Sequence, residues 1–178
     1  MKLYHTGQVE IRTPDIRHGR VNADFGQGFY MTPDADFTYR WARADAVVNA
    51  YELDLAGLDV RRFTRSVEWF DYIYNNRRAK DLIEADAVVG PIANDTIFDT
   101  FGIISSGYLK PEDALDLLMI GPEYTQVAVK TDRAAAQLKW LGVEYVTDAA
   151  AHAAALRSER EEYDRLFAQA LDRLRAAH

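Results

Sequence analysis

Three short segments carry the residue types that can do chemistry. They are LYHTG at 3–7, DFGQGFYMT at 24–32 and GPIANDTIFDTF at 90–101. The imidazole of His5 can hydrogen-bond a hydroxyl group. The glycines of the second segment allow close backbone approach and precede Tyr30, whose aromatic face suits a flat cation. The three segments are therefore the candidates for a functional site.

Each segment also has an ordinary structural explanation when it is taken alone. A histidine at the end of a strand is usually a hydrogen-bonding residue of the fold, and a tyrosine after a glycine turn is usually half-buried. The pair Asn94-Asp95, after the Gly-Pro turn, is typical of a helix cap. A functional interpretation therefore depends on the combination of the segments.

Length, charge and composition exclude several function classes. The 178 residues suit one domain, and the net charge of -7 argues against a surface that coats nucleic acid. Cysteine is absent, and the four histidines lack paired ligand spacing, so we expect no metal. We find neither an apolar run of about 18 residues nor a secretory signal, which favours a cytoplasmic protein. A set of basic residues could form a local groove for nucleic acid, although the simpler interpretation is that they are solvated charges. These residues are Arg61, Arg62, Arg65, Arg77, Arg78 and Lys80.

The elements that must position these segments follow from hydrophobic periodicity. Strands are predicted at 2–6, at 28–32, at 49–55, at 86–90, at 125–131 and at 143–147. Helices are predicted at 66–78, at 111–119 and at 33–48, the last with Thr32 as its N-cap. Gly90-Pro91 is expected to stop a strand as a turn. The order of elements predicts a mixed α+β chain with no regular βαβ repeat.

The C-terminal stretch differs in composition from the rest of the chain. Residues 148–178 are rich in alanine and predict one helix that begins after Asp148, in addition to a domain at 1–147. Its apolar residues form a narrow stripe: Leu156, Tyr163, Phe167, Ala170 and Leu174. The helix packs either on its own domain, which we favour, or on a partner.

The segments taken in order resemble a known pattern. LYHTG, DFGQGFYMT, RWA, VNAYELD, NNR, GPIANDTIF and YTQVAVKT are similar to a bacterial family of uncharacterised domains within the ADP-ribosyltransferase superfamily. That superfamily places a histidine, a tyrosine and then an acidic or amide residue on successive strands, which here correspond to His5, Tyr30 and Gln126. The resemblance covers roughly residues 2–141. It implies an α+β fold with a split β-sheet core, flanking helices and a C-terminal helix.

The resemblance also implies a ligand, NAD, and roles for individual residues. His5 would bind a ribose hydroxyl, and Tyr30 would stack on nicotinamide. Gly26 and Gly28 would let the backbone approach the dinucleotide. Pyrophosphate would be met by a basic residue, for which the sequence does not choose among Arg12, Arg40 and Arg77. The remaining contacts implied for NAD are Thr6, Gly7, Phe29 and Asn94.

Gln126 departs from the superfamily members with strong transferase activity, which commonly have glutamate at this place. Glutamine can orient a hydroxyl but supplies only a dipole, so a carboxylate such as Asp95 or Glu123 would assist, and Asp24 is a further candidate for the general base. The leading hypothesis is a mono-ADP-ribosyltransferase that acts on a protein, a nucleic acid or a small molecule. An NAD glycohydrolase and a non-catalytic NAD-binding or ADP-ribose-binding module are the alternatives. Small bacterial members often act as toxins or in phage defence, which would imply an antitoxin or immunity protein as partner.

Overall fold

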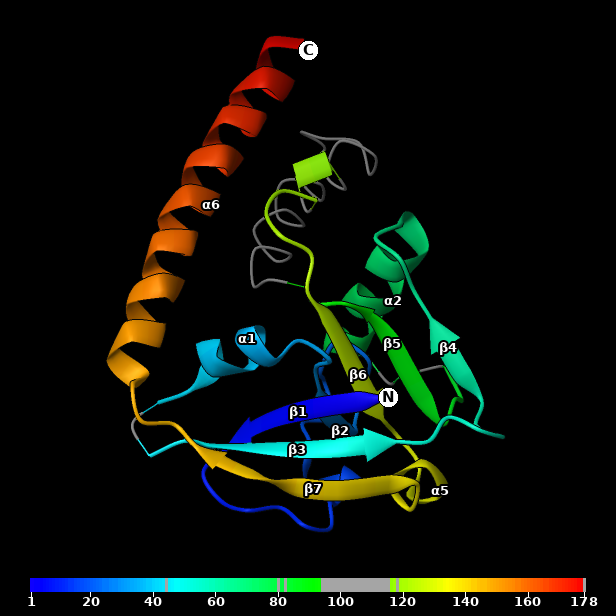
Figure 1. The fold of residues 1–178 in the computed structure, drawn as a ribbon. Helices are drawn as coiled ribbons and strands as arrows, with labels where there is room; N and C mark the ends of the chain where they lie inside the picture. Colours follow the sequence, from blue (N-terminus) through cyan, green and yellow to red (C-terminus); the bar gives the residue numbers. More distant parts are fainter. Residues whose placement is uncertain (44, 80, 82, 94–115, 118, 178) are drawn as a thin grey trace.

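The strands that the structure describes form two sheets (Figure 1). A computed structural model describes residues 1–43, 45–79, 81, 83–93, 116–117 and 119–177. The first sheet has the order β1 (Lys2–Gly7), β3 (Val47–Leu53), β7 (Leu138–Tyr145). The second has the order β2 (Phe29–Met31), β6 (Thr125–Val129), β5 (Ala87–Pro91), β4 (Val60–Arg62). The described helices are α1 (Ala35–Thr38), α2 (Val67–Arg78), α5 (Asp132–Ala135) and α6 (Ala149–Ala177), with 3-10 turns η1 (Ile16–His18) and η2 (Tyr39–Trp41).

The two sheets meet where β1 passes the end of β2. Tyr4 and Thr32 form a backbone bridge there, with N–H···O distances of 2.8 and 2.9 Å. We call this junction, with the adjoining residues of β1 and β2, the seam. All pairs within the sheets are antiparallel except that of β4 with β5. The structure thus confirms the α+β class with a divided β core and a C-terminal helix.

Alternation of side chains along the strands produces two apolar layers. The layer between the sheets contains Leu3, Phe29, Met31, Tyr51, Leu53, Val89, Val127 and Val129. The layer between the second sheet and α2 contains Phe25, Phe63, Trp69, Phe70, Tyr72, Ile73, Val88 and Ala128. Strands β5 and β6 contribute to both layers, and their side chains are buried on both faces. Side chains on the face of β6 toward α2 are therefore buried, and a polar side chain on that face needs a partner inside the protein.

Helix α2 forms where the sequence predicts it. Ser66 caps its first turn by accepting a hydrogen bond from the Trp69 N–H at 3.2 Å. Trp69, Ile73 and Asn76 recur at helical spacing and are buried against the second sheet. The last turn then brings Arg77 to the end of β5.

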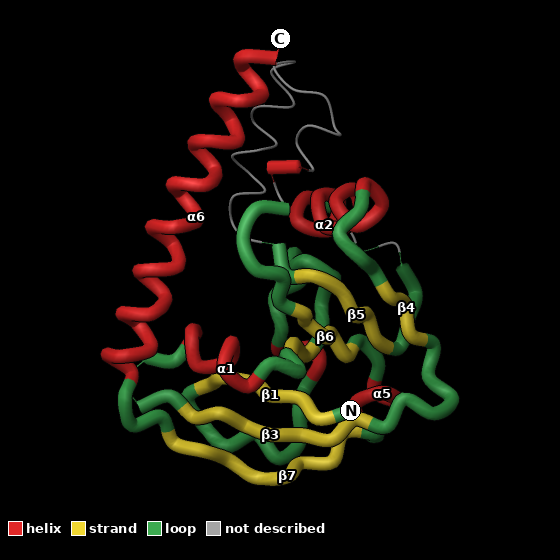
Figure 2. Tube along the Cα trace, turned by 45° about the horizontal axis from the view of Figure 1, so that its top comes forward, coloured by secondary structure: helices red, strands yellow, loops and turns green. Residues whose placement is uncertain are grey.

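Helix α6 rests on the body near its first turns, and its far end projects away from the sheets (Figures 1 and 2). Asp148 caps it as expected, accepting from the Ala151 N–H at 3.0 Å. His152 stacks on Tyr39 with ring centres 4.9 Å apart. None of the described helices is both long enough and apolar enough to cross a bilayer.

Several local expectations are wrong. The helix predicted at 33–48 ends at Thr38, continues as the short turn η2, and gives way to β3 at Val47. Asp34 caps it instead of Thr32, whose hydroxyl donates to the Thr125 carbonyl across the second sheet. Strand pairing on both sides of β3 overrides the helical stripe, because buried β-branched residues fit a sheet well. The helix predicted at 111–119 lies largely outside the described residues.

The expected Gly90-Pro91 turn is also wrong, because both residues belong to β5. They pair with Gln126 and Thr125 of β6. A Cβ at Gly90 would lie 3.0 Å from the ring of Phe25 and 3.1 Å from Phe63. Phe25 and Phe63 therefore leave little room for a side chain at this position, which lies in a strand and not in a turn.

Candidate functional site

The candidate site is centred on the seam, where the first two motif segments touch. His5 Nδ1 lies 2.7 Å from the carbonyl oxygen of Tyr30. The imidazole packs against Phe29 with ring centres 4.5 Å apart and the planes tilted by 33°, and Phe29 packs edge-on against Tyr51. His5 is therefore held by a hydrogen bond at one nitrogen and by an aromatic ring at one face.

The bond to Tyr30 determines which nitrogen of His5 carries the proton. A carbonyl oxygen only accepts, so Nδ1 donates and Nε2 is left with its lone pair in the neutral ring. Burial lowers the pKa of His5 below 6.5, partly offset by the bond to the Tyr30 carbonyl. Nε2 faces Gly7, where an added Cβ would be in van der Waals contact with it at 3.6 Å. The His-Thr-Gly sequence thus presents an acceptor at neutral pH.

The lowered pKa of His5 predicts a specific pH dependence of stability. Below pH 6.5 the unfolded chain binds a proton at His5 more readily than the folded chain, so the free energy of unfolding falls as the pH decreases. His5→Asn keeps a donor near the Tyr30 carbonyl but does not titrate. We expect urea unfolding between pH 7.5 and 5 to show a smaller decline for His5→Asn than for the wild type. The matched variant His18→Asn, at an exposed position, should follow the wild type; equal declines in all three proteins would contradict the assignment.

Tyr30 lies on the opposite face of β2 from Phe29, toward α2. Its hydroxyl accepts from the Phe25 N–H at 2.8 Å and donates to the Gly26 carbonyl at 2.7 Å. Burial raises the pKa of Tyr30, so the hydroxyl stays protonated at neutral pH. The hydroxyl therefore closes the glycine loop that precedes β2, and the half-buried ring remains as the part that can meet a ligand.

Removal of this hydroxyl should weaken the fold. Tyr30→Phe leaves the Phe25 N–H without its partner, and we expect the free energy of unfolding to fall by about 1–3 kcal/mol. Urea denaturation measures this change. The control is Tyr145→Phe, which removes an exposed hydroxyl bonded to Glu10 at 3.1 Å and should unfold close to the wild type. A Tyr30→Phe protein as stable as the control would show that the loop closes without the hydroxyl.

Gln126, the third predicted residue, lies on β6, the strand that pairs with β2. Ala128 is the register partner of Tyr30, and Gln126 is two residues further, about 7 Å along the same face. The Gln126 side chain is 7% exposed. Its Nε2 lies 2.9 Å from Asp24 Oδ2 and 3.3 Å from the Pro91 carbonyl.

Asp24 joins four motif segments in one buried cluster. Arg77 Nη2 lies 2.6 Å from Asp24 Oδ1, and both side chains are only 11% exposed. The Ala93 N–H donates to Asp24 Oδ2 at 3.3 Å. We call Asp24, Arg77 and Gln126, with the backbone of Pro91 and Ala93, the Asp24 cluster. From the sequence, Asp24 is only one of three candidate catalytic carboxylates, and nothing in the sequence indicates that Arg77 is its partner.

The two motif glycines at positions 26 and 28 are explained by contacts inside the protein. Gly26 has φ +77°, and a Cβ there would lie 2.2 Å from Asp81 Oδ2. A Cβ at Gly28 would lie 2.7 Å from the Val129 carbonyl. Asp81 is itself held by Lys130, which also donates to the Ile83 carbonyl at 3.0 Å. The close approach that the sequence predicts for a ligand is thus already made by neighbouring segments.

The three arginines considered for pyrophosphate lie in three different settings. Arg12 stacks over Trp140 of β7 at 4.8 Å and contacts Glu10 at 3.3 Å. Arg77 belongs to the Asp24 cluster. Arg40 contacts the Tyr124 hydroxyl, stacks over that ring at 4.5 Å, and pairs with Glu159 of α6 at 2.5 Å. Of the three arginines, Arg77 is the one that contacts Asp24, the hydrogen-bond partner of Gln126.

The other predicted residues are placed as follows. The hydroxyl of Thr6 contacts that of Thr38 at 2.8 Å, which ties β1 to α1. Glu123 pairs with Arg65 at 3.7 Å. Asn94 and Asp95 lie outside the described residues.

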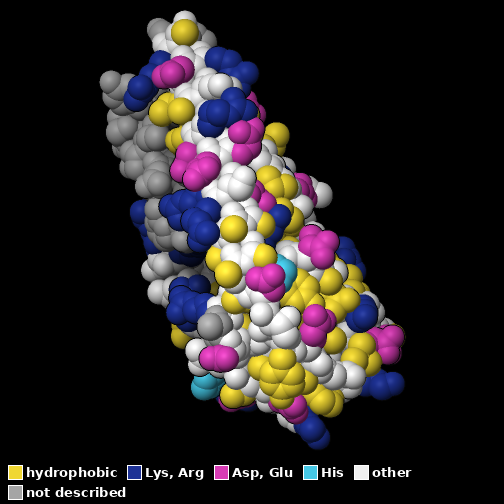
Figure 3. Space-filling view, turned by 60° about the vertical axis from the view of Figure 1, so that its left-hand side comes forward, with side chains coloured by type: hydrophobic (Ala, Val, Ile, Leu, Met, Phe, Trp, Pro, Cys, Tyr) yellow, Lys and Arg dark blue, Asp and Glu magenta, His cyan; other side chains and the backbone are white. Residues whose placement is uncertain are grey.

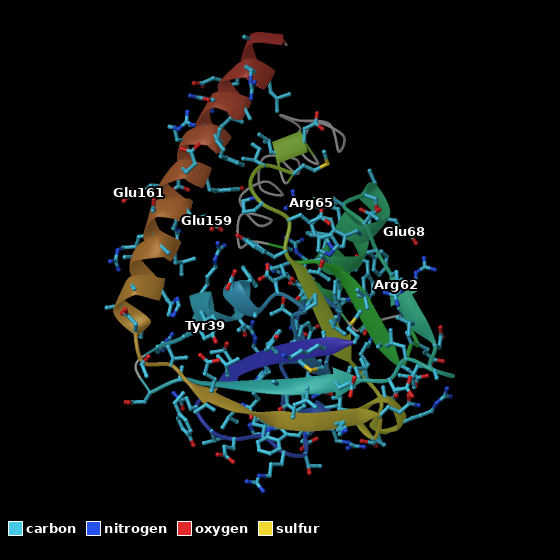
Figure 4. The ribbon with its side chains drawn as sticks, in the orientation of Figure 1. Tyr39, Arg62, Arg65, Glu68, Glu159 and Glu161 are labelled. Atoms are coloured by element: carbon cyan, nitrogen blue, oxygen red, sulfur yellow. The ribbon has the colours of Figure 1, made fainter. Side chains whose placement is uncertain are left out.

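Arg61, Arg65 and Arg77, three of the six basic residues considered for a groove, have acidic or backbone partners, and Lys80 lies outside the described residues. Arg65, which is labelled in Figure 4, donates to the carbonyls of Met119 and Pro122. Arg61 pairs with Glu68. Acidic and basic side chains are interspersed along the face that α6 presents (Figure 3). These pairings favour the interpretation as solvated and paired charges.

A model of the family described as a protein of unknown function, DUF3990, matches residues 1–140. The chain belongs to the DUF3990 family. The DUF3990 match takes in the seam and the whole Asp24 cluster, and α6 lies outside it. No curated protein and no solved structure matches the chain. The DUF3990 description names no activity, so function has to be argued from the site.

Proposed function

We propose that this DUF3990 protein is an NAD-dependent mono-ADP-ribosyltransferase with its site at the seam. The observation that carries the proposal is the 2.7 Å contact between His5 Nδ1 and the Tyr30 carbonyl, which joins the first two motif segments. Gln126 follows on the strand next to Tyr30 and on the same face. The resemblance in sequence order is thus matched by proximity in space.

The chemistry assigned to each residue uses the atoms that the fold leaves available. His5 Nε2 accepts a hydrogen bond from a ribose hydroxyl, and the Tyr30 ring stacks on nicotinamide. The bond between ribose C1 and the nicotinamide nitrogen breaks, nicotinamide leaves with the electron pair, and positive charge develops on the sugar. An acceptor nucleophile then bonds to C1 and loses its proton. Nicotinamide and an ADP-ribosylated macromolecule are the products.

The test is incubation of the protein and a cell lysate with NAD labelled in its adenylate part. We expect nicotinamide release together with transfer of label to protein or nucleic acid, and no transfer from labelled ATP used as control. Equal release without lysate and without transfer would assign the protein as an NAD glycohydrolase. Neither release nor a thermal shift with NAD would reject NAD as the ligand.

A further inference from the structure

The orientation of the Gln126 amide is determined by its two neighbours. Asp24 Oδ2 and the Pro91 carbonyl both lie within 3.3 Å of the same terminal atom of Gln126. Both are acceptors, so the atom between them must be the NH2 nitrogen. Its two protons are then used inside the protein. Oε1 is the polar atom of Gln126 that remains for a ligand.

Asp24 cannot turn away from Gln126, because its carboxylate is fixed at both oxygens. Oδ1 accepts from Arg77 Nε at 2.7 Å, and Oδ2 accepts from the Ala93 N–H at 3.3 Å. Asn76 also donates to the Asp24 backbone carbonyl at 3.0 Å, which anchors the residue to α2. The acceptor that faces position 126 is thus part of a rigid, buried assembly.

We propose that Asp24 is the positioning residue of this site: it holds the amide of Gln126 so that Oε1 accepts from a ribose hydroxyl, and it excludes glutamate from position 126. The second half of this role, contact with ribose, rests on the proposed function. The first half concerns the protein alone. Asp24 therefore explains why this chain has glutamine at position 126, where the superfamily that it resembles commonly has glutamate.

Glutamate at position 126 would place a third acceptor against Asp24 Oδ2 and the Pro91 carbonyl, with no proton between it and either of them. A carboxyl oxygen would face Asp24 Oδ2 and the Pro91 carbonyl, so one of the two acids would have to keep a proton. The pKa of the pair would rise in the folded state, and stability would be lost as the pH rises through that raised value. The described ionisable groups that face the pair are Arg77 and Tyr30. Burial raises the pKa of Tyr30, so its hydroxyl stays protonated between pH 5 and 8.

The first arm of the test measures melting temperature against pH. Gln126→Glu should melt about 5 °C or more below the wild type at pH 8, and the gap should narrow toward pH 5. The double variant Asp24→Asn/Gln126→Glu restores one amide and one carboxylate and should lose most of this pH dependence. Gln169→Glu, which adds the same charge at an exposed position of α6, is the control. If Gln126→Glu does not fold at pH 8, the inference requires that the double variant still folds there. A dependence of melting temperature on pH in Gln126→Glu that matches the control Gln169→Glu overturns the inference.

The second arm measures kcat and KM for nicotinamide release. In Asp24→Asn the amide of Gln126 turns to accept from Asn, so we expect kcat to fall about 10-fold or more with little change in KM. The double variant should recover most of the lost kcat, which a merely structural loss would not allow. A wild-type rate in Asp24→Asn, or no recovery in the double variant, overturns the positioning role. If the wild type releases no nicotinamide, the proposed function is rejected instead. The dependence of melting temperature on pH then still decides whether Asp24 is the reason for the amide at position 126.

Discussion

Arg77→Met is expected to lower the free energy of unfolding by about 3–5 kcal/mol, because it leaves the carboxylate of Asp24 buried without its counter-charge. Both side chains of the pair are 11% exposed, so water replaces the guanidinium poorly. The change also removes the bond from Arg77 Nη2 to the Ala93 carbonyl at 3.3 Å. The loss should appear as a lower midpoint in urea with an unchanged m-value.

Two further proteins separate the buried pair from general effects of removing an arginine. Arg17→Met breaks an ion pair with Asp132 whose side chains are 67% and 68% exposed, and it should unfold close to the wild type. The double variant Asp24→Asn/Arg77→Met removes both charges and should be more stable than Arg77→Met alone. If Arg77→Met unfolds like Arg17→Met, the Asp24 cluster does not hold the fold together.

His5→Asn is expected to reduce NAD-dependent nicotinamide release by about 100-fold or more, if the proposed function is correct. Asparagine places an amide nitrogen near the position of Nδ1, so the bond to the Tyr30 carbonyl can be kept. It has no atom at the position of Nε2, the ring nitrogen that faces Gly7. Release of nicotinamide and the melting temperature should be measured on the same preparation.

The matched control is His152→Asn, which removes the stacking of His152 on Tyr39 at the base of α6. We expect nicotinamide release near the wild-type rate from this variant. Near-normal release from His5→Asn, in a protein that melts as the wild type does, would place the reaction elsewhere. A parallel loss of release in both variants would point to a general loss of folded protein.

The elements whose patterns are local could be predicted from the sequence. Strand β6, helix α2 and the Asp148 cap of α6 lie within a few residues of their predicted positions. In each case the signal is a run of alternating or helically spaced apolar residues, or a capping side chain beside its partner. The neighbourhood of His5 and Tyr30 followed only from the resemblance, because the two residues are 25 positions apart.

Features that depend on distant segments could not be predicted. The helical stripe through Val48 was overridden because β3 lies between β1 and β7. Arg77 appeared as a free cation for pyrophosphate, and its partner Asp24 lies 53 positions earlier. Gly90 appeared as a turn residue, whereas it lies in β5 and packs closely against Phe25 and Phe63 from other segments. Each error has the same physical origin: a local pattern does not reveal which side chain the fold brings to the same place.

The Asp24 cluster has a consequence for how sequences of this fold can diverge. Its three side chains come from the glycine loop, from α2 and from β6, and each satisfies a charge or a proton of another. A homologue that replaces Arg77 should therefore also replace Asp24, and one with glutamate at position 126 should have a neutral residue at position 24. An alignment in which these three columns vary independently would be incompatible with the cluster. Correlated change at the three positions would occur whether or not the homologue retains an enzymatic activity.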